Sequence, residues 1–284
     1  MIGCLLWVLI ALLINFPQYA RGGFRESRVF REGMGRSLRD YLPLLLVVLV
    51  YENMTHLFPL VVEHLADPSL MELDSIIFGT QPTIWMERIN HPLLTDYLTF
   101  AYLLYFFLPA LPALVFSITG RRGDFRDLML AICLSLYIAY LGYTLVPAIG
   151  PKYYMPERYS MDLQGIFLYQ RVEPVWDLMR STTRDCFPSH HTAMSLISFY
   201  YIGRLKDHSR ASKWVYYAYI PLTLSLIFST IYLRYHWVVD VAAGFILAGI
   251  SIWAANWLNR TWSSKVAPLP GNEDGNSERG MPVV

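Results

Sequence analysis

Residues 236–258 read HWVVDVAAGFILAGISIWAANWL, an apolar run in which Asp240 is the only acidic residue. About 20 mostly apolar residues in a helix cross the hydrocarbon core of a bilayer. The run is long enough, and its His and Asp stand at its start, where a membrane helix meets water. This stretch therefore predicts a membrane-spanning helix that begins with polar residues at the membrane surface.

Five further apolar runs of this length precede it. They cover residues 41–62, 97–119, 128–149, 187–205 and 214–233. A shorter stretch over residues 1–16 has no basic residue before it and is expected to be a retained membrane helix. The expected fold is all-α: a polytopic membrane helical bundle with a six-helix core plus one N-terminal helix.

Composition agrees with a membrane protein. Of 284 residues, 55% are hydrophobic and 16% are charged, against roughly 25% charged in an average soluble domain. The net charge of +1 gives no basic excess for nucleic acid, so membrane lipids are the expected surroundings. The three cysteines, Cys4, Cys133 and Cys186, do not have the spacing of metal ligands, and three is not an even set for disulfides. They indicate no zinc or redox role. No cofactor, metal or particular oligomeric state is indicated.

The chain divides into three parts. Residues 1–40 are expected to be an N-terminal membrane helix and a basic cytoplasmic loop, and residues 41–262 a transmembrane domain that carries the polar motifs. Residues 263–284 hold many Pro, Gly and acidic residues and are expected to be a disordered tail. Within the domain, residues 63–96 mix acidic and apolar residues, which favours an interfacial or re-entrant segment. Pro109, Pro112 and Pro221 lie inside apolar runs and predict kinks.

The distribution of basic residues predicts the orientation, because cytoplasmic loops carry the excess of Lys and Arg. Sixteen of the 23 lie in the loop at 21–40, near Arg121, between 204 and 213 and in the tail, all on one side of the alternating runs. Six of the other seven lie between Lys152 and Arg234. A multi-pass protein whose polar motifs, and hence active site, face the exoplasm is the coherent interpretation.

Three polar blocks stand at that face: residues 147–152, 184–191 and 234–240. His236 and Asp240 are four residues apart, so in a helix they share one face. An imidazole oriented by a carboxylate can serve as a nucleophile or base. His191, which comes from another helix, could give a proton to a leaving oxygen. The pattern indicates phosphate-ester chemistry on a lipid.

Cationic and neutral donors accompany the histidines. Lys152, Arg184 and Arg234 are the candidate ligands of phosphoryl oxygens, with Ser189 as a neutral donor. Four other histidines are expected to be interfacial polar residues: His56, His64, His91 and His208. Five aromatic residues are expected to form an interfacial belt: Tyr153, Tyr154, Tyr232, Tyr235 and Trp237.

Two of these stretches resemble signature motifs of a known family. Phe187-Pro-Ser-His-His191 and Ser229-Thr-Ile-Tyr-Leu-Arg-Tyr-His-Trp-Val-Val-Asp240 are similar to the second and third motifs of the type 2 phosphatidic acid phosphatase superfamily. The nearest branch includes inositol phosphorylceramide synthases, and the resemblance covers residues 143–249. It implies the six-helix core and four roles: His236 as the nucleophile that forms a phosphohistidine, Asp240 as its orienting partner, His191 as general acid and then base, and Ser189 as a phosphate ligand.

The chain departs from the family pattern at three places. Seven positions after Lys152 the sequence has Tyr159, where the first motif has Arg-Pro. Thr230 follows the opening Ser of the third motif where Arg is usual, and Arg234 could supply that charge. His190 takes a position usually held by Gly or an apolar residue, and its role stays open.

The hypothesis is therefore an integral membrane lipid phosphatase that acts without a metal on a lipid phosphate or diphosphate through a phosphohistidine intermediate. A lipid phosphotransferase, in which an alcohol replaces water, is the first alternative, and residues 153–185 are expected to form the pocket wall that decides between them. The second alternative is a non-catalytic lipid-binding membrane protein. A transporter is least favoured, because the chain shows no internal repeat of helices.

Overall fold

The computed structural model describes the chain except for residues 1–41, 44–45, 48, 52–63, 180–183 and 266–284. The predicted N-terminal helix, most of the run at 41–62 and nearly all of the predicted tail lie outside the described residues. Within the described part, every regular element is a helix, and one isolated β-bridge joins Ala148 to Asp185. The all-α prediction is confirmed for this part of the chain.

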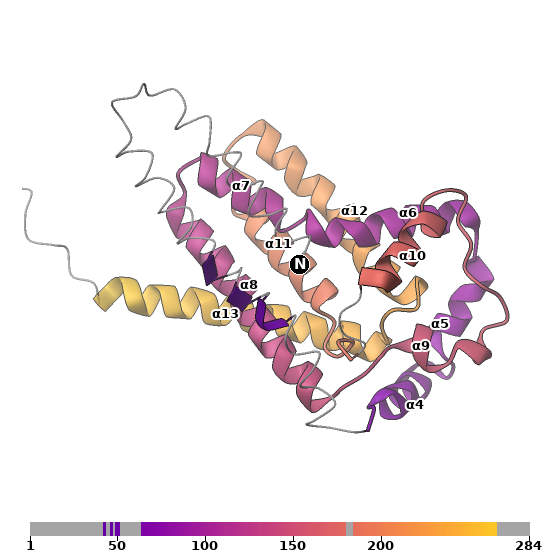
Figure 1. The fold of residues 1–284 in the computed structure, drawn as a ribbon. Helices are drawn as coiled ribbons and strands as arrows, with labels where there is room; N and C mark the ends of the chain where they lie inside the picture. Colours follow the sequence, from indigo (N-terminus) through magenta and orange to yellow (C-terminus); the bar gives the residue numbers. More distant parts are fainter. Residues whose placement is uncertain (1–41, 44–45, 48, 52–63, 180–183, 266–284) are drawn as a thin grey trace, which may run out of the picture.

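The helices follow one another with short connections (Figure 1). In chain order they are α4 (Asp67–Phe78), α5 (Pro82–Trp85), η2 (Met86–Ile89), α6 (Pro92–Leu103), η3 (Leu104–Phe106), α7 (Ala110–Ile118), α8 (Arg122–Leu145), α9 (Pro151–Tyr154), η4 (Pro156–Arg158), α10 (Tyr169–Met179), α11 (His190–Gly203), α12 (Arg210–Tyr232) and α13 (Val238–Lys265).

Three of these helices, α8, α12 and α13, are long and apolar enough to cross a membrane. The count is up to four if the bent pair α6–η3 and α7 forms one span. The expected six-helix core is therefore not found among the described residues. The run at 187–205 yields α11, whose 14 residues fall short of the roughly 20 that cross a bilayer, and the run at 41–62 is largely undescribed.

The run at 97–119 breaks where its prolines stand. The helical axis bends by 43° between the end of η3 at Phe106 and the start of α7 at Ala110. Pro109 is the N-cap residue of α7. Proline lacks a backbone N–H, and its ring clashes with the preceding turn, so an uninterrupted helix is disfavoured there. A kink in this run, predicted from its prolines, is confirmed, whereas Pro221 lies inside α12, which is one helix from Arg210 to Tyr232.

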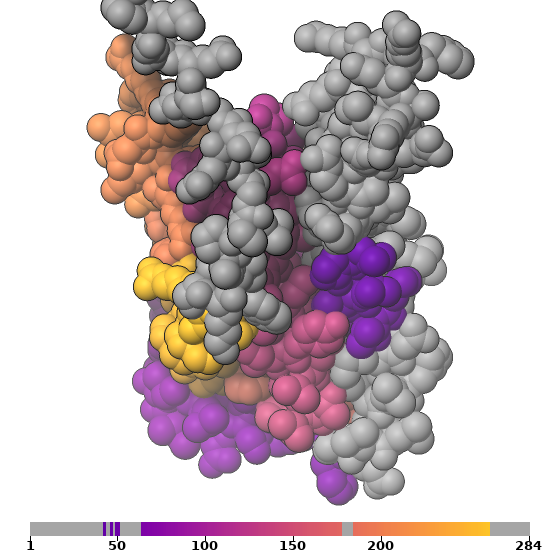
Figure 2. Space-filling view, turned by 90° about the vertical axis from the view of Figure 1, so that its left-hand side faces the viewer, coloured from indigo at the N-terminus to yellow at the C-terminus, as the bar shows by residue number. Residues whose placement is uncertain are grey.

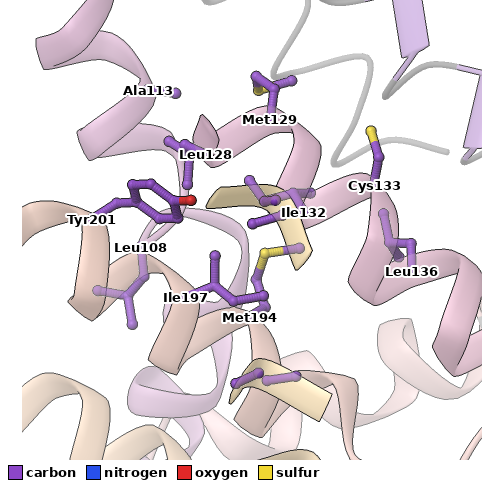
Figure 3. Packing of buried hydrophobic residues seen from close by; sticks show 14 of the residues in the cluster. Leu108, Ala113, Leu128, Met129, Ile132, Cys133, Leu136, Met194, Ile197 and Tyr201 are labelled. Atoms are coloured by element: carbon purple, nitrogen blue, oxygen red, sulfur yellow. The ribbon is translucent and has the colours of Figure 1, made fainter. Parts of the chain in front are cut away.

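Helix α11 lies at the centre of the bundle, packed against α8, α12 and α13 (Figure 1). Figure 3 shows Ile132 of α8 beside Met194 and Ile197 of α11, all three of them buried. The start of α11 approaches α13 closely at Gly244, where a Cβ atom would lie 2.6 Å from the Ser189 carbonyl oxygen. Small residues allow such close approach of helices, and this contact sets the first turn of α11 against the first turns of α13.

The C-terminal end of α11 is held by an ion-pair network. The Arg204 guanidinium donates to Asp124 at 3.0 Å, to Asp127 at 2.7 Å and to the Asn256 side-chain oxygen at 2.6 Å. The network joins the start of α8 to the C-terminal half of α13. Figure 2 shows the side toward which the yellow C-terminal end of α13 points. Arg204 belongs to the basic residues that the sequence predicts to face the cytoplasm.

Residues 64–96 contain α4, α5, η2 and the start of α6, and none of the first three is a candidate span. Helix α4 has two faces. Asp67 and Asp74 are wholly buried, whereas Ile76 and Ile77 are 70% and 60% exposed. A helix with one buried face and one exposed face agrees with the prediction that this segment does not span the membrane. Its contact with the membrane interface stays a prediction.

Candidate active site

Backbone hydrogen bonds bring the three polar blocks together. The Cys186 N–H donates to the Ala148 carbonyl at 3.1 Å, and the Lys152 N–H donates to the Arg234 carbonyl at 2.7 Å. The Ser189 N–H donates in turn to the Asp240 carbonyl at 3.1 Å. Segments that are far apart in the sequence thus form one site at the starts of α11 and α13.

Gly150 lies where the blocks cross. Its φ is +84°, in a region that side chains other than glycine rarely adopt. A Cβ atom there would collide with the Tyr235 carbonyl oxygen and lie 3.2 Å from the Cys186 sulfur. Only glycine allows the three segments to pack at this distance.

His236 lies between a carboxylate and a second imidazole. Its Nδ1 is 3.5 Å from the Asp240 Oδ2 atom, a long hydrogen-bond distance. Its Nε2 is 3.3 Å from the Nδ1 of His191. His236 is 4% exposed and Asp240 is wholly buried. The structure therefore brings together the three residues predicted to be catalytic, each with a ring nitrogen or carboxylate oxygen directed at the next.

Asp240 receives two further hydrogen bonds at the same oxygen. The Trp237 N–H donates to Oδ2 at 2.9 Å, and the Cys186 thiol donates to it at 2.7 Å. Burial raises the pKa of Cys186 well above its usual value, and the negative charge of Asp240 adds to this effect. The thiol is consequently protonated and serves as a donor to the carboxylate.

Cys186, His236 and Asp240 form a compact group of possible metal ligands, whose donor atoms all lie within 4.8 Å of one another. The sequence indicated no such group, because Cys186 is 50 residues from His236 and belongs to no ligand motif. The chemistry of the donors, a thiol, an imidazole and a carboxylate, is compatible with a transition-metal ion.

Aromatic rings from outside the predicted motifs surround His191. Tyr102 of α6 stacks on its ring with a centroid distance of 4.6 Å, and Tyr105 of η3 lies at 4.3 Å. Trp176 of α10 meets Tyr102 edge to face at 5.5 Å. Trp176 lies within residues 153–185, whose role as the pocket wall stays a prediction, whereas α6 and η3 contribute the tyrosine rings that touch His191.

Ser189 and His190 have structural contacts at the start of α11. The buried Ser189 is the N-cap residue, and its Oγ accepts from the Thr192 N–H at 3.3 Å. The His190 ring lies 2.9 Å from the Tyr105 hydroxyl and 3.2 Å from the Ser135 hydroxyl. His190 therefore joins α11 to η3 and α8, a role that the sequence left open.

Lys152 is paired with acidic residues of α10. Its ammonium contacts the Glu173 carboxylate and lies 3.5 Å from Asp177. It also lies over the rings of Tyr153 and Tyr235, at 5.0 and 5.2 Å from their centroids. The lysine thus stands beside the segment that leads into His236, with its charge matched by α10.

The side chain of Arg234 is also paired. Its guanidinium donates to Glu87 at 3.0 Å and to the Met161 carbonyl at 2.9 Å, and it stacks over Tyr159 at 3.6 Å. Arg184 is half-buried and directly precedes the β-bridge at Asp185. The roles of the three cations as phosphate ligands stay predictions.

The predicted interfacial belt is wrong for two of its five members. Trp237 is wholly buried and Tyr232 is 1% exposed. Tyr235 is half-buried and stacks on Tyr102 with a centroid distance of 4.8 Å. Trp237 packs in one buried hydrophobic cluster, and Tyr232 and Tyr235 pack in another.

Sequence reasoning missed two buried carboxylates of α4. Asp67 accepts from the N–H groups of Ile149 and Gly150, both at 2.9 Å, and from the Trp237 indole at 3.0 Å. Asp74 accepts from the first two N–H groups of α13. Their spacing of seven residues places both on one face of α4. This spacing in the sequence is the signal that could have identified them.

The described part of the chain is a helical protein in which three or four helices could cross a membrane, and it carries a His–His–Asp group. Residues 69–254 match the family model of the PAP2 superfamily, and the chain belongs to that superfamily. The match includes all three polar blocks. No curated protein and no solved structure gives a match. Members of the superfamily are generally phosphatases or phosphotransferases and are often membrane-bound, so membership suggests a phosphatase-type activity.

Proposed function

We propose that this chain is an integral membrane lipid phosphatase that acts on a lipid phosphate or diphosphate through a phosphohistidine at His236. The observation that carries the proposal is the arrangement of the two imidazoles. Nδ1 of His236 faces the Asp240 carboxylate, and Nε2 lies 3.3 Å from Nδ1 of His191. A hydrogen bond from Nδ1–H to Asp240 leaves the lone pair on Nε2 free to attack phosphorus.

The reaction then has two steps. The Nε2 atom of His236 attacks phosphorus, the bond from phosphorus to the lipid oxygen breaks, and protonated His191 gives its proton to the leaving oxygen. Neutral His191 next removes a proton from water, which attacks the phosphohistidine and releases phosphate. Asp240 stabilises the positive charge that develops on the His236 ring during attack.

The proposal assigns binding of the phosphoryl oxygens to Lys152, Arg184 and Arg234, with Ser189 as a neutral donor. The Lys152 ammonium contacts Glu173 and the Arg234 guanidinium contacts Glu87, so the proposal requires a phosphate group to displace these carboxylates. A phosphate group can exchange with these carboxylates, because it offers the same acceptor chemistry to the cations.

A phosphotransferase related to inositol phosphorylceramide synthases is the second candidate. It is favoured by the aromatic enclosure of His191, because a wall of rings at the proton-transferring residue restricts water and could seat an alcohol. Product distribution separates the two, since an acceptor competes with water only after the phosphohistidine has formed. With a labelled lipid phosphate and rising inositol or glycerol, a constant yield of free phosphate supports the phosphatase. A phosphorylated polyol or phosphodiester that rises at its expense supports the transferase.

Substitution of the two histidines tests the assigned roles. His236→Ala should abolish turnover of both a lipid phosphate and an activated aryl phosphate, because the nucleophile is lost. His191→Ala should keep more activity on the aryl phosphate, whose leaving group needs little protonation. The exposed His208 provides the matched control, and His208→Ala should behave like the parent protein.

Equal relative losses in the two variants on both substrates would leave the acid and nucleophile roles unsupported. A purified parent chain that turns over no lipid phosphate, aryl phosphate or lipid diphosphate, yet binds lipid, would favour the non-catalytic lipid-binding alternative.

A further inference from the structure

We infer that Cys186, His236 and Asp240 form a binding site for a thiophilic divalent cation of the Zn²⁺ and Cd²⁺ class, and that the bound ion blocks the His236 nucleophile. The site coincides with the proposed catalytic pair, so the ion acts as an inhibitor and not as a resident cofactor. The inhibition rests on the proposed function, whereas the binding of the ion does not.

The distances between the three donor atoms suit a small tetrahedral ion. The Cys186 sulfur and the His236 Nδ1 are 3.5 Å apart, and Nδ1 and Oδ2 of Asp240 are also 3.5 Å apart. Zinc bonds of about 2.3 Å to sulfur and about 2.0–2.2 Å to nitrogen and oxygen imply donor separations of roughly 3.3–3.6 Å at tetrahedral angles. The sulfur and Oδ2, now 2.7 Å apart, would separate once the ion replaces the thiol proton between them.

A further donor is available at the same carboxylate. The Oδ1 atom of Asp240 is buried and has no hydrogen-bond partner among the described residues. A buried carboxylate oxygen without a donor is costly, and a cation would satisfy it. Asp240 can therefore bind the ion through one or both oxygens, which completes a site with one sulfur, one nitrogen and at least one oxygen.

The donor set selects the kind of ion. Thiolate and imidazole ligands suit Zn²⁺ and other thiophilic ions. Mg²⁺ and Ca²⁺ prefer oxygen ligands and six or more of them, so neither fits a site in which a thiol and an imidazole are two of the three donors. Magnesium is accordingly a suitable negative control.

Binding of the ion has a defined effect on His236. The Cys186 thiol loses its proton to solvent, and the metal takes the lone pair of Nδ1 in the neutral ring. The remaining ring proton then resides on Nε2, which faces His191. Because Nε2 no longer has a free lone pair, it cannot attack phosphorus. One ion per site should stop formation of the phosphohistidine.

The test uses purified full-length protein after treatment with a chelator and its removal. Cadmium is titrated while ultraviolet cadmium–thiolate absorption and turnover of a lipid phosphate are followed in parallel. Cys186→Ser should abolish the absorption and raise the inhibitory cadmium concentration at least tenfold, with inhibition expressed relative to the uninhibited rate of each variant. Cys133→Ser, at the other buried free cysteine among the described residues, should leave both signals as in the parent. Magnesium at the same concentrations should give neither.

A second measurement does not require removal of Cys186. In a Cys4→Ser, Cys133→Ser background, Cys186 is the single thiol, and zinc X-ray absorption should show one zinc–sulfur distance of about 2.3 Å. Absence of sulfur from the zinc shell overturns the site, as does equal inhibition of the parent and Cys186→Ser proteins. Thiolate absorption depends on no turnover, so a protein that binds cadmium but hydrolyses nothing would refute the proposed function alone.

Discussion

Asp74 of α4 should control the geometry of His236 although it lies outside the catalytic group. It is wholly buried, and its two oxygens accept from the N–H groups of Val238 at 2.8 Å and Val239 at 3.0 Å. These are the first two residues of α13, between His236 and Asp240. Asp74 thus caps the helix that carries Asp240 and that begins two residues after His236.

The substitution Asp74→Asn keeps the shape and removes one acceptor. The amide oxygen can accept from one N–H, while the amide NH₂ meets the other donor, so one buried backbone N–H loses its partner. A hydrogen bond to a charged group contributes about 1.5–3 kcal/mol, and an unsatisfied buried donor costs about 1–3 kcal/mol. Burial raises the pKa of Asp74, against the lowering effect of the two hydrogen bonds, so part of this stabilisation is already offset. The lost hydrogen bond and the unsatisfied donor are the same interaction, so a net loss of about 1–3 kcal/mol is expected.

The assay measures thermal unfolding in detergent and kcat/KM on a lipid phosphate. If about 2 kcal/mol of the loss appears as misorientation of His236, kcat/KM falls about 30-fold. Glu72→Gln, an exposed carboxylate on the same helix, is the matched control and should change neither quantity. If Asp74→Asn matches Glu72→Gln in stability and rate, the inference that α4 positions the catalytic pair is refuted.

Three other perturbations test the site and its orientation. Gly150→Ala should lower stability by more than the roughly 1–3 kcal/mol of a backbone conformation that is nearly restricted to glycine, because Cβ also meets the Tyr235 carbonyl; an unchanged melting temperature, equal to that of the unobstructed Gly249→Ala control, would contradict this. Turnover should survive excess EDTA, and a loss that magnesium or zinc restores would show that a metal takes part in catalysis. In intact cells, an impermeant thiol reagent should label a single cysteine placed near Arg171 but not one near Arg122; the reverse pattern would put the chemistry in the cytoplasm.

The sequence was sufficient for features that depend on neighbours along one helix. Apolar runs of spanning length identified α8, α12 and α13, and prolines located the break before α7. Motif similarity joined His191 to His236 and Asp240. The shared helical face predicted for His236 and Asp240 is wrong in detail, because His236 precedes the first residue of α13. Run length alone overestimated α11. The helix begins only after its N-cap residue Ser189 and ends at Gly203, so it is shorter than the apolar run at 187–205.

Only the tertiary structure decided which distant groups meet these residues. Cys186 reaches Asp240 across 54 positions, and Arg234 reaches Glu87 across 147. Asp67 reaches the Trp237 indole across 170. None of these pairs shares a helix or a periodic pattern, so they cannot be predicted from the spacing of residues along the sequence. A buried carboxylate, thiol or guanidinium must find its partner wherever the packed helices bring one within hydrogen-bond distance, and that is a property of the assembled fold.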